Sequence, residues 1–223
     1  MLMNCKNIKR SFPAPDGTPF YALKGVSIDI PKQSLVILKG RSGSGKTTLM
    51  NILGALDLPT EGEVLFEGTN ICNLTEEDRE NLRRYKIGFV FQSIGLVPMM
   101  SAYENVEFAL RMTGKTDSAD ERIRESLSMV GLLDRANHRP IEMSGGEQQR
   151  IAIARAMVHK PQIIFADEPT GALDTTTGLS VMKIFKKMIE TDGSTIVMTT
   201  HDPNMMEFGD VVYEIEDGEI VGK

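Results

Sequence analysis

The sequence predicts an α/β fold with a mainly parallel central sheet, and three observations support this prediction. A short apolar run, LVIL, leads into a glycine-rich loop and then into an apolar helical segment. A second apolar run, QIIFA, ends in two acidic residues. Strand-like and helix-like segments alternate along much of the chain. Such alternation favours a parallel sheet, whose ligands bind at the carboxyl ends of the strands.

The N-terminal part of the chain is predicted to form short strands separated by turns. Val26, Ile28 and Ile30 alternate with polar residues, as expected for a half-buried strand. The segment FPAPDGTP at 12–19 is rich in proline and is expected to be a loop. The elements expected up to residue 66 are strands at 1–8, 21–30, 35–38 and 63–66 and a helix at 47–53.

The middle of the chain is predicted to be mainly helical. Thr75 is a candidate N-cap, because three acidic residues follow it and arginines end the segment. A core strand is expected at 87–91, and a helical insertion of roughly 60 residues follows it. The expected helices are 75–84, 101–112, 118–133 and 144–160.

Strand character returns in the C-terminal part. Apolar runs predict buried strands at 162–166 and 194–199, with an amphipathic helix at 177–191 between them. The turn sequence EDG is flanked by two short apolar runs, which predicts a hairpin of strands 211–215 and 219–221.

The glycine-rich loop carries a phosphate-binding pattern. Gly40, Gly45, Lys46 and Thr47 match G-x-x-x-x-G-K-[ST]. Glycines let backbone N–H groups approach phosphate oxygens, and the N-terminus of the following helix favours the same anion. Lys46 supplies a positive charge for the β- and γ-phosphates, and the Thr47 hydroxyl is placed to ligate Mg²⁺. The loop therefore predicts nucleotide binding.

Two acids and a histidine are expected at the same edge of the sheet. Asp167 follows a buried strand and is placed to hold Mg²⁺ beside Thr47, while Glu168 is suited to polarise an attacking water. His201 follows another predicted strand and could contact a γ-phosphate, although a lone histidine there is more often structural. The acids are therefore the second half of the candidate site.

A further helix start has the features of an anion site. Ser144 and Glu147 have the spacing of a capping box, and Gly145 and Gly146 leave backbone N–H groups bare at the positive end of the helix. On these residues alone, an ordinary capped helix is an equally good interpretation. His159, near the end of this helix, is expected to be only a favourable charge against the helix dipole.

The composition limits the kinds of partner that this chain is expected to bind. The chain has 25 Lys and Arg residues against 31 Asp and Glu residues, so no nucleic-acid partner is expected. Cys5 and Cys72 stand outside any metal or disulfide pattern and are expected to be free thiols. No apolar run approaches the ~18 residues of a membrane span, and the N-terminus has no signal-peptide core. Work at a membrane would therefore require a partner.

Together these motifs resemble the ATPase subunit of ABC transporters over essentially the whole chain. Phe12 stands where that family places an aromatic residue that stacks on adenine, with Tyr21 as the alternative. The matching motifs are Walker A at Gly40–Thr47, the Q-loop at Gln92, the signature SGGEQ at Ser144–Gln148, Walker B at Ile163–Asp167 with Glu168, the D-loop at Gly171–Asp174, and the switch His201.

The resemblance implies ATP and Mg²⁺ as cofactors and a dimer in which each ATP lies between the P-loop of one copy and Ser144–Gly146 of the other. Glu168 would be the general base, His201 would hold the γ-phosphate, and Asp174 would couple the two sites. The implied catalytic residues are Glu168, His201 and Lys46, and the implied metal ligands are Thr47, Gln92 and Asp167. The implied nucleotide contacts are Phe12, Gly40, Arg41, Ser42, Gly43, Ser44, Gly45, Lys46, Thr47, Thr48, Gln92, Ser144, Gly145, Gly146, Glu147 and Asp174.

The resemblance also implies an organisation and a partner. The chain would be one ABC ATPase domain, with a core and antiparallel β subdomain at 1–91 and 161–223 and a helical lobe at about 92–160. Its motifs look like the branch of macrolide exporters, lipoprotein-releasing complexes and antimicrobial-peptide resistance pumps. Such a subunit would power a separate permease, for export or mechanical work, from the cytoplasmic face of the membrane. The alternative is a signalling module that acts on an FtsX-like membrane partner.

The surface for that partner is expected around 92–103. Its apolar residues Leu96, Val97, Met99 and Met100 are candidates for contact with a partner helix, and packing into the core is an equally good interpretation.

Overall fold

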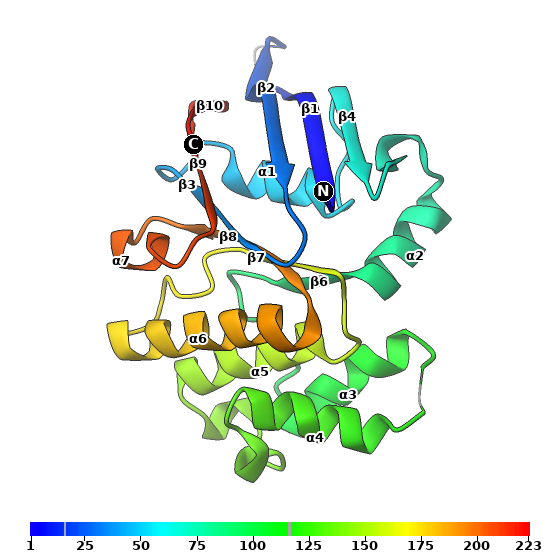
Figure 1. The fold of residues 1–223 in the computed structure, drawn as a ribbon, viewed down its shortest axis with the longest axis vertical. Coiled ribbons are helices and arrows are strands. Elements are labelled where there is room, and N and C mark those ends of the chain that lie inside the picture. Colours follow the sequence, from blue (N-terminus) through cyan, green and yellow to red (C-terminus); the bar gives the residue numbers. More distant parts are fainter. Residues whose placement is uncertain (16, 116) are drawn as a thin grey trace.

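The computed structural model describes residues 1–15, 17–115 and 117–223 and has three layers (Figure 1). A four-stranded antiparallel sheet has the order β2-β1-β4-β5, and a six-stranded sheet has the order β10-β9-β3-β8-β7-β6. The pairs from β9 through β6 are parallel, and only β10 joins antiparallel. This arrangement confirms the predicted α/β fold with its mainly parallel sheet and N-terminal antiparallel sheet.

The strands lie close to the positions that the apolar runs predict. They are β1 (Met3–Pro13), β2 (Pro19–Ile30), β3 (Leu35–Lys39), β4 (Glu61–Phe66), β5 (Thr69–Asn70), β6 (Ile87–Val90), β7 (Ile163–Ala166), β8 (Thr195–Thr200), β9 (Val211–Glu216) and β10 (Glu219–Gly222). β1 and β2 are longer than expected, because their antiparallel pairing continues to Pro13 and Pro19. The expected loop at 12–19 is therefore wrong at both ends, and Asp16 within it lies outside the described residues.

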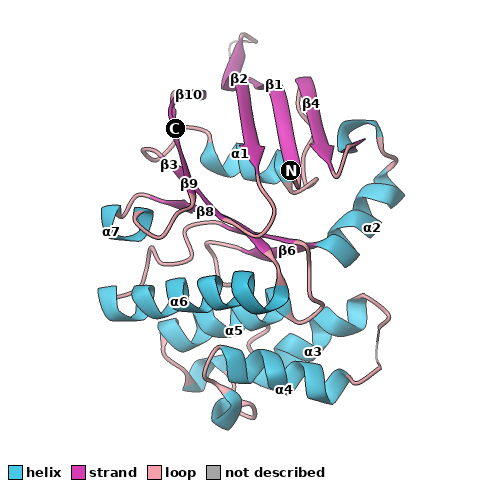
Figure 2. Ribbon diagram, in the orientation of Figure 1, coloured by secondary structure: helices cyan, strands magenta, loops and turns pink. Residues whose placement is uncertain are grey.

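The helices cover the six-stranded sheet on the side away from the antiparallel sheet, apart from α1, α2 and α7 (Figure 2). They are α1 (Lys46–Leu53), α2 (Glu76–Lys86), α3 (Ala102–Met112), α4 (Ala119–Met129), α5 (Gly145–Met157), α6 (Thr175–Asp192) and α7 (Pro203–Met206). Short 3₁₀ turns at Ile71–Asn73, Leu133–Arg135 and Pro140–Glu142 complete the chain. α4 and α5 end before the residues expected, and α7 was not predicted.

Two apolar cores lie on opposite faces of the six-stranded sheet. Along β3, Leu35 and Ile37 face the core shared with α3 to α6, while Val36 and Leu38 face the core shared with α1 and the antiparallel sheet. All four side chains are fully buried. Burial on both faces explains why this strand reads as a continuous apolar run without alternation. Because β3 is packed on both faces, the glycine-rich loop that follows it lies at the edge of the sheet.

The end of α5 corrects one expectation. His159 is half-buried, its Nε2 lies 3.1 Å from the carbonyl oxygen of Ile87, and burial lowers the pKa of its imidazole. The ring is therefore neutral near pH 7, and the expectation of a positive charge against the helix dipole is wrong. No helix within the described part of the chain is long and apolar enough to cross a membrane.

Candidate active site

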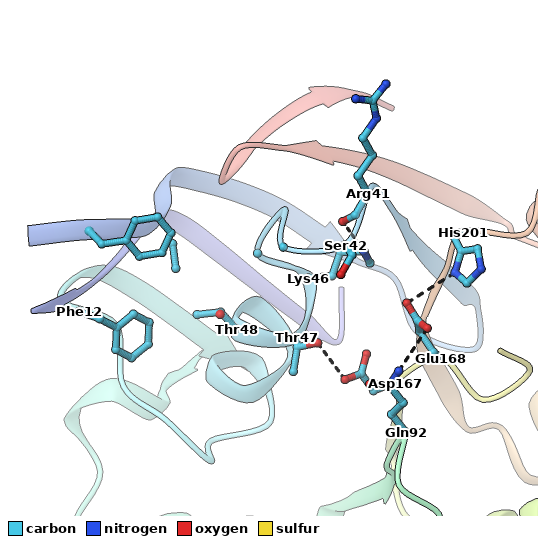
Figure 3. Close-up of a pocket in the computed structure, with 14 residues that line it drawn as sticks. Phe12, Arg41, Ser42, Lys46, Thr47, Thr48, Gln92, Asp167, Glu168 and His201 are labelled. Carbon is cyan, nitrogen blue, oxygen red and sulfur yellow. Dashed lines mark hydrogen bonds and ion pairs between the residues drawn. The ribbon is translucent and has the colours of Figure 1, made fainter. Parts of the chain in front are cut away.

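A cavity of about 700 Å³ opens at the carboxyl ends of β3, β7 and β8 (Figure 3). It brings together residues that are far apart in sequence, including Phe12, Gln92 and His201. Its lining residues are Phe12, Phe20, Ala22, Arg41, Ser42, Gly43, Gly45, Lys46, Thr47, Thr48, Gln92, Asp167, Glu168 and His201. Most of the residues that the sequence predicts for a nucleotide site therefore share one cavity.

The P-loop is shaped by close contacts with its neighbours. A Cβ atom on Gly40 would lie 2.2 Å from the carbonyl oxygen of Ile215, and one on Gly45 would lie 2.6 Å from that of Ala22. Both glycines have positive φ, 156° and 104°, which side chains disfavour. The packing against β2 and β9 therefore requires glycine at both positions.

The P-loop ends in a helix start that is suited to an anion. Gly45 is the N-cap of α1 and gives it no side-chain cap, so the first N–H groups of α1 remain available to a phosphate. Lys46 lies across the loop, and its Nζ donates to the carbonyl oxygens of Gly40 at 2.7 Å and Arg41 at 2.8 Å. The ammonium group is therefore held against the backbone of the P-loop.

The two acids are held by one threonine. The Thr47 hydroxyl donates to Asp167 Oδ2 at 2.9 Å, and the Thr199 hydroxyl donates to Asp167 Oδ1 at 2.7 Å. The same Thr199 oxygen accepts the backbone N–H of Glu168 at 2.8 Å. Thr199 is fully buried at the end of β8 and was not predicted as a site residue. It orients Asp167 toward Thr47 and fixes the backbone of Glu168.

Glu168 has a strained backbone and two polar neighbours. Its φ of 45° lies in the left-handed region, which non-glycine residues adopt at a cost of about 1–2 kcal/mol. Gln92 Nε2 lies 3.5 Å from Glu168 Oε2, and His201 Nδ1 lies 3.6 Å from Oε1 (Figure 3). The carboxylate thus faces the cavity between an amide and an imidazole, where it could accept a proton from water.

Two phenylalanines form the other end of the cavity. Phe12 on β1 and Phe20 on β2 are direct cross-strand partners, and both line the cavity. Tyr21 is not among the described residues that line it. The geometry therefore favours Phe12 over Tyr21 as the aromatic contact for a base. Phe20 was missed because strand register, which the sequence does not show, decides that it lies opposite Phe12.

The signature helix start lies outside this cavity. Ser144 is the N-cap of α5, where its Oγ accepts the N–H of Glu147 at 3.2 Å and its own N–H donates to Glu147 Oε2 at 2.8 Å. The Ser144 hydrogen bonds lower the pKa of the Glu147 carboxyl. Gly145 lines a separate cavity of about 200 Å³ together with Gln92 and Glu168. The predicted capping box is present.

Asp174 begins α6 rather than facing the P-loop. Its carboxylate accepts the N–H of Thr177 at 3.0 Å and the hydroxyl of Thr177 at 2.6 Å, which lowers its pKa. The site residues predicted from the resemblance thus divide into one group that lines the large cavity, two P-loop residues, Gly40 and Ser44, that belong to the loop without lining the cavity, and a group away from the loop: Ser144, Gly145, Gly146, Glu147 and Asp174.

Comparison with known proteins decides the family. The family model described as ABC transporter matches residues 23–171, which is more than half of the chain. The chain belongs to the ABC transporter family. An ABC transporter ATP-binding protein of Methanocaldococcus jannaschii is 44% identical over 98% of this chain and 95% of its own length. The lipoprotein-releasing system ATP-binding protein LolD of Aquifex aeolicus is 43% identical, over 100% of this chain and 97% of its own length.

Combined export proteins and solved structures agree with this assignment. The macrolide export ATP-binding/permease protein MacB of Syntrophobacter fumaroxidans is 45% identical over 89% of this chain, which matches 28% of that longer protein. A dimeric post-hydrolysis structure of the M. jannaschii cassette with ADP and Pi matches with a TM-score of 0.91 at 42% identity, covering 99% of this chain and 97% of that one. This ABC protein is therefore an ATP-binding ATPase subunit, as the sequence predicted.

Proposed function

We propose that this ABC subunit works as a pair that hydrolyses ATP with Mg²⁺ and drives a separate membrane permease for export or mechanical work. The observation that carries the proposal is the convergence of Lys46, Thr47, Asp167 and Glu168 on one cavity. These groups come from two segments, the start of α1 and the loop after β7, and combine a phosphate cradle, metal ligands and a general base.

The donors beside Lys46 fit Mg²⁺. The Thr47 hydroxyl and the Asp167 carboxylate are already 2.9 Å apart, and Gln92 adds an amide to the same cavity. Mg²⁺ prefers such oxygen donors and is usually held by one or two carboxylates plus substrate phosphates. Among the described residues, no group of three or more His, Cys, Asp or Glu side chains is arranged to hold a metal ion. Bound Mg²⁺ would neutralise charge on the phosphates.

Different residues of the chain have different roles in binding and hydrolysing ATP. Lys46 exchanges the carbonyl oxygens of Gly40 and Arg41 for phosphate oxygens, and the first N–H groups of α1 contact the same anion. Glu168 takes a proton from the attacking water, and His201 contacts the γ-phosphate from the other side of that carboxylate. Phe12 stacks on adenine at the far end of the cavity. The remaining P-loop residues, Arg41, Ser42, Gly43, Ser44 and Thr48, surround the phosphates.

The second copy supplies the group of residues that lies outside the cavity. Ser144, Gly145 and Gly146 present the bare N-terminus of α5, and within their own chain they do not line the large cavity. In the proposed dimer this helix start, with Glu147, faces the ATP held by the P-loop of the partner. Asp174, fixed as the N-cap of α6, links the two sites. The dimeric structures of the M. jannaschii cassette support this arrangement.

The helical lobe at about 92–160 is proposed to contact the permease at the cytoplasmic face of the membrane. Val97 and Met99 follow Gln92 and are exposed, Met99 by 74%, whereas Leu96 packs partly into the core. Val97 and Met99 are therefore better candidates for the partner surface than Leu96. The relatives' names include macrolide export, pyoverdine export and lipoprotein release, which supports peptide, antibiotic or lipoprotein-type cargo.

Phosphate release tests the proposal. The wild-type subunit, alone or with its permease, should release phosphate from ATP, and removal of Mg²⁺ with a chelator should stop it. Glu168→Gln should lower kcat by about 100-fold or more, because the amide cannot accept the proton. If Glu168→Gln hydrolyses ATP as fast as the wild type, the proposed role of Glu168 is wrong.

A further inference from the structure

Arg155 on α5 joins the signature helix to the segment that carries Gln92. Its Nη2 donates to the carbonyl oxygen of Ile94 at 2.9 Å, and its Nη1 donates to that of Gly95 at 2.5 Å. Ile94 and Gly95 are more than 50 positions away from Arg155 in sequence and lie two and three residues after Gln92. The guanidinium therefore crosses from the third turn of α5 to the loop after β6.

The charge of Arg155 has no acidic counterpart in the described part of the chain. The described ion pairs include thirteen of Arg or Lys with Asp or Glu elsewhere, whereas the hydrogen bonds described for the side chain of Arg155 go to loop carbonyls. Burial lowers the pKa of its guanidinium, with no carboxylate acting against that shift. A half-buried charge is costly unless it is hydrogen-bonded, so the contact with the loop is the main compensation for burying it. If these hydrogen bonds break, the guanidinium loses its compensation for burial and the loop loses a contact that holds its backbone.

The segment between Val90 and Val97 is otherwise held mainly at its ends. β6 ends at Val90, which accepts the N–H of Asp167 at 2.8 Å, and the Val97 N–H donates to the buried Asn105 side chain at 2.8 Å. In the middle of the segment, two to three residues after Gln92, Arg155 supplies the described side-chain hydrogen bonds to the backbone, beside the packing of Ile94 and Leu96 against the core. It therefore sets the path of the backbone that presents the Gln92 amide to Glu168.

The same helix carries the signature residues at its other end. α5 begins at Gly145, and Gly145, Gln92, Ile94 and Glu168 line the cavity of about 200 Å³ between the two segments. A rotation or shift of α5 would therefore move Ile94 and Gly95 with it through Arg155. Arg155 therefore joins the signature helix to the Q-loop by hydrogen bonds, in addition to the apolar packing of Ile94 against the core that α5 shares.

We propose that Arg155 is a positioning residue, which fixes the Gln92 loop to the signature helix and so keeps the Gln92 amide beside Glu168 when Ser144–Gly146 dock on a second copy's ATP. This inference rests on the proposed function and adds to it a residue that acts through Gln92 and does not touch the substrate. It also names the contact through which the signature helix and the site of hydrolysis would be coupled, and this coupling acts in both directions.

A double-mutant cycle with phosphate release tests the inference. Arg155→Met should lower kcat by roughly 10-fold in the wild-type background, because a small misplacement of an active-site group has effects of this size. In a Gln92→Ala background the same change should alter kcat by less than about twofold, since there is no amide left to place. Arg155→Lys keeps the positive charge but has one donor nitrogen where arginine uses two. Its kcat should therefore lie between those of the wild type and Arg155→Met. Arg122→Met is the matched control, because Arg122 also donates to a carbonyl oxygen of the lobe, that of Val158, at 2.9 Å.

Amide hydrogen exchange supplies a readout that does not depend on turnover. Arg155→Met should speed exchange across 93–97 by roughly 10-fold and leave α1 unchanged, whereas Arg122→Met should leave 93–97 unchanged. Equal losses of kcat in both backgrounds, or unchanged exchange at 93–97, would overturn the inference. If Arg155→Met does not fold, the Arg155→Lys cycle carries the same test. An inactive wild-type subunit would refute the proposed function instead, so the two failures are distinguishable.

Discussion

Thr199→Val is the substitution that probes the acidic end of the site most directly. Valine keeps the shape of the buried side chain and removes only the hydroxyl. That hydroxyl donates to Asp167 at 2.7 Å and accepts the N–H of Glu168 at 2.8 Å. A hydrogen bond to a carboxylate contributes about 1.5–3 kcal/mol, and a buried N–H left unpaired costs about 1–3 kcal/mol.

The expected loss of stability follows from these two contacts. Because the two terms overlap, we expect the free energy of unfolding to fall by about 3 kcal/mol, which for a chain of this size lowers Tm by about 6–12 °C. The left-handed backbone of Glu168 also loses a contact that maintains it, so kcat should fall by between about 10-fold and 100-fold. Phosphate release and thermal unfolding measure the two effects.

Thr195→Val is the matched control on the same strand. The Thr195 hydroxyl is equally buried and accepts the N–H of Gln33 at 2.9 Å, at the end of β8 away from the acids. Thr195→Val should lower Tm by somewhat less than Thr199→Val does, and it should leave kcat within about twofold of the wild-type value. The reasoning would be refuted if Thr199→Val kept the wild-type kcat while losing stability like the control.

Three further predictions concern the adenine-stacking residue, the half-buried His159 and the permease surface. Phe12→Ala should raise the KM for ATP by about 10-fold through loss of stacking and leave kcat nearly unchanged, and Tyr21→Ala should change neither; equal effects of the two would contradict the assignment of the base site. Burial lowers the pKa of His159 below its ordinary value of 6.5, so the unfolded chain binds a proton that the folded chain does not. Stability should therefore fall as the pH drops below 6.5, and His159→Gln should reduce that fall in Tm; parallel curves would contradict it. Met99→Asp should weaken co-purification with the permease and leave ATP binding intact, whereas Val221→Asp on the exposed β10 should affect neither.

The parts of the site that the sequence predicts are those whose geometry is local. The P-loop pattern fixes Gly40, Gly45, Lys46 and Thr47 within one strand–loop–helix unit, and the capping box fixes Ser144 and Glu147 within one turn. Strand ends and helix starts are encoded by residues a few positions apart, so their spacing is enough. For the same reason the order of strands and helices was predicted well, apart from element ends and the short elements β5 and α7.

The parts that the sequence does not predict depend on contacts between distant segments. Phe20 lines the cavity because β1 and β2 pair in one register, and Thr199 serves the two acids because β7 and β8 are adjacent and parallel. In the sequence, Arg155 is one of several charged residues on a predicted helix. Its role depends on the packing of the loop at Ile94 beside that helix. Neither strand register nor helix–loop packing follows from residue spacing alone.

The central claim is that two copies enclose ATP and that Glu168 acts as the general base in its hydrolysis. Size-exclusion chromatography with light scattering, on the wild type and on Glu168→Gln with and without ATP, tests this claim most directly. We expect Glu168→Gln with ATP to run as a stable dimer, and the wild type to return to monomer as it hydrolyses the nucleotide. Dimers of both proteins without nucleotide, or no ATP-dependent dimer of Glu168→Gln even in complex with the permease, would contradict the account.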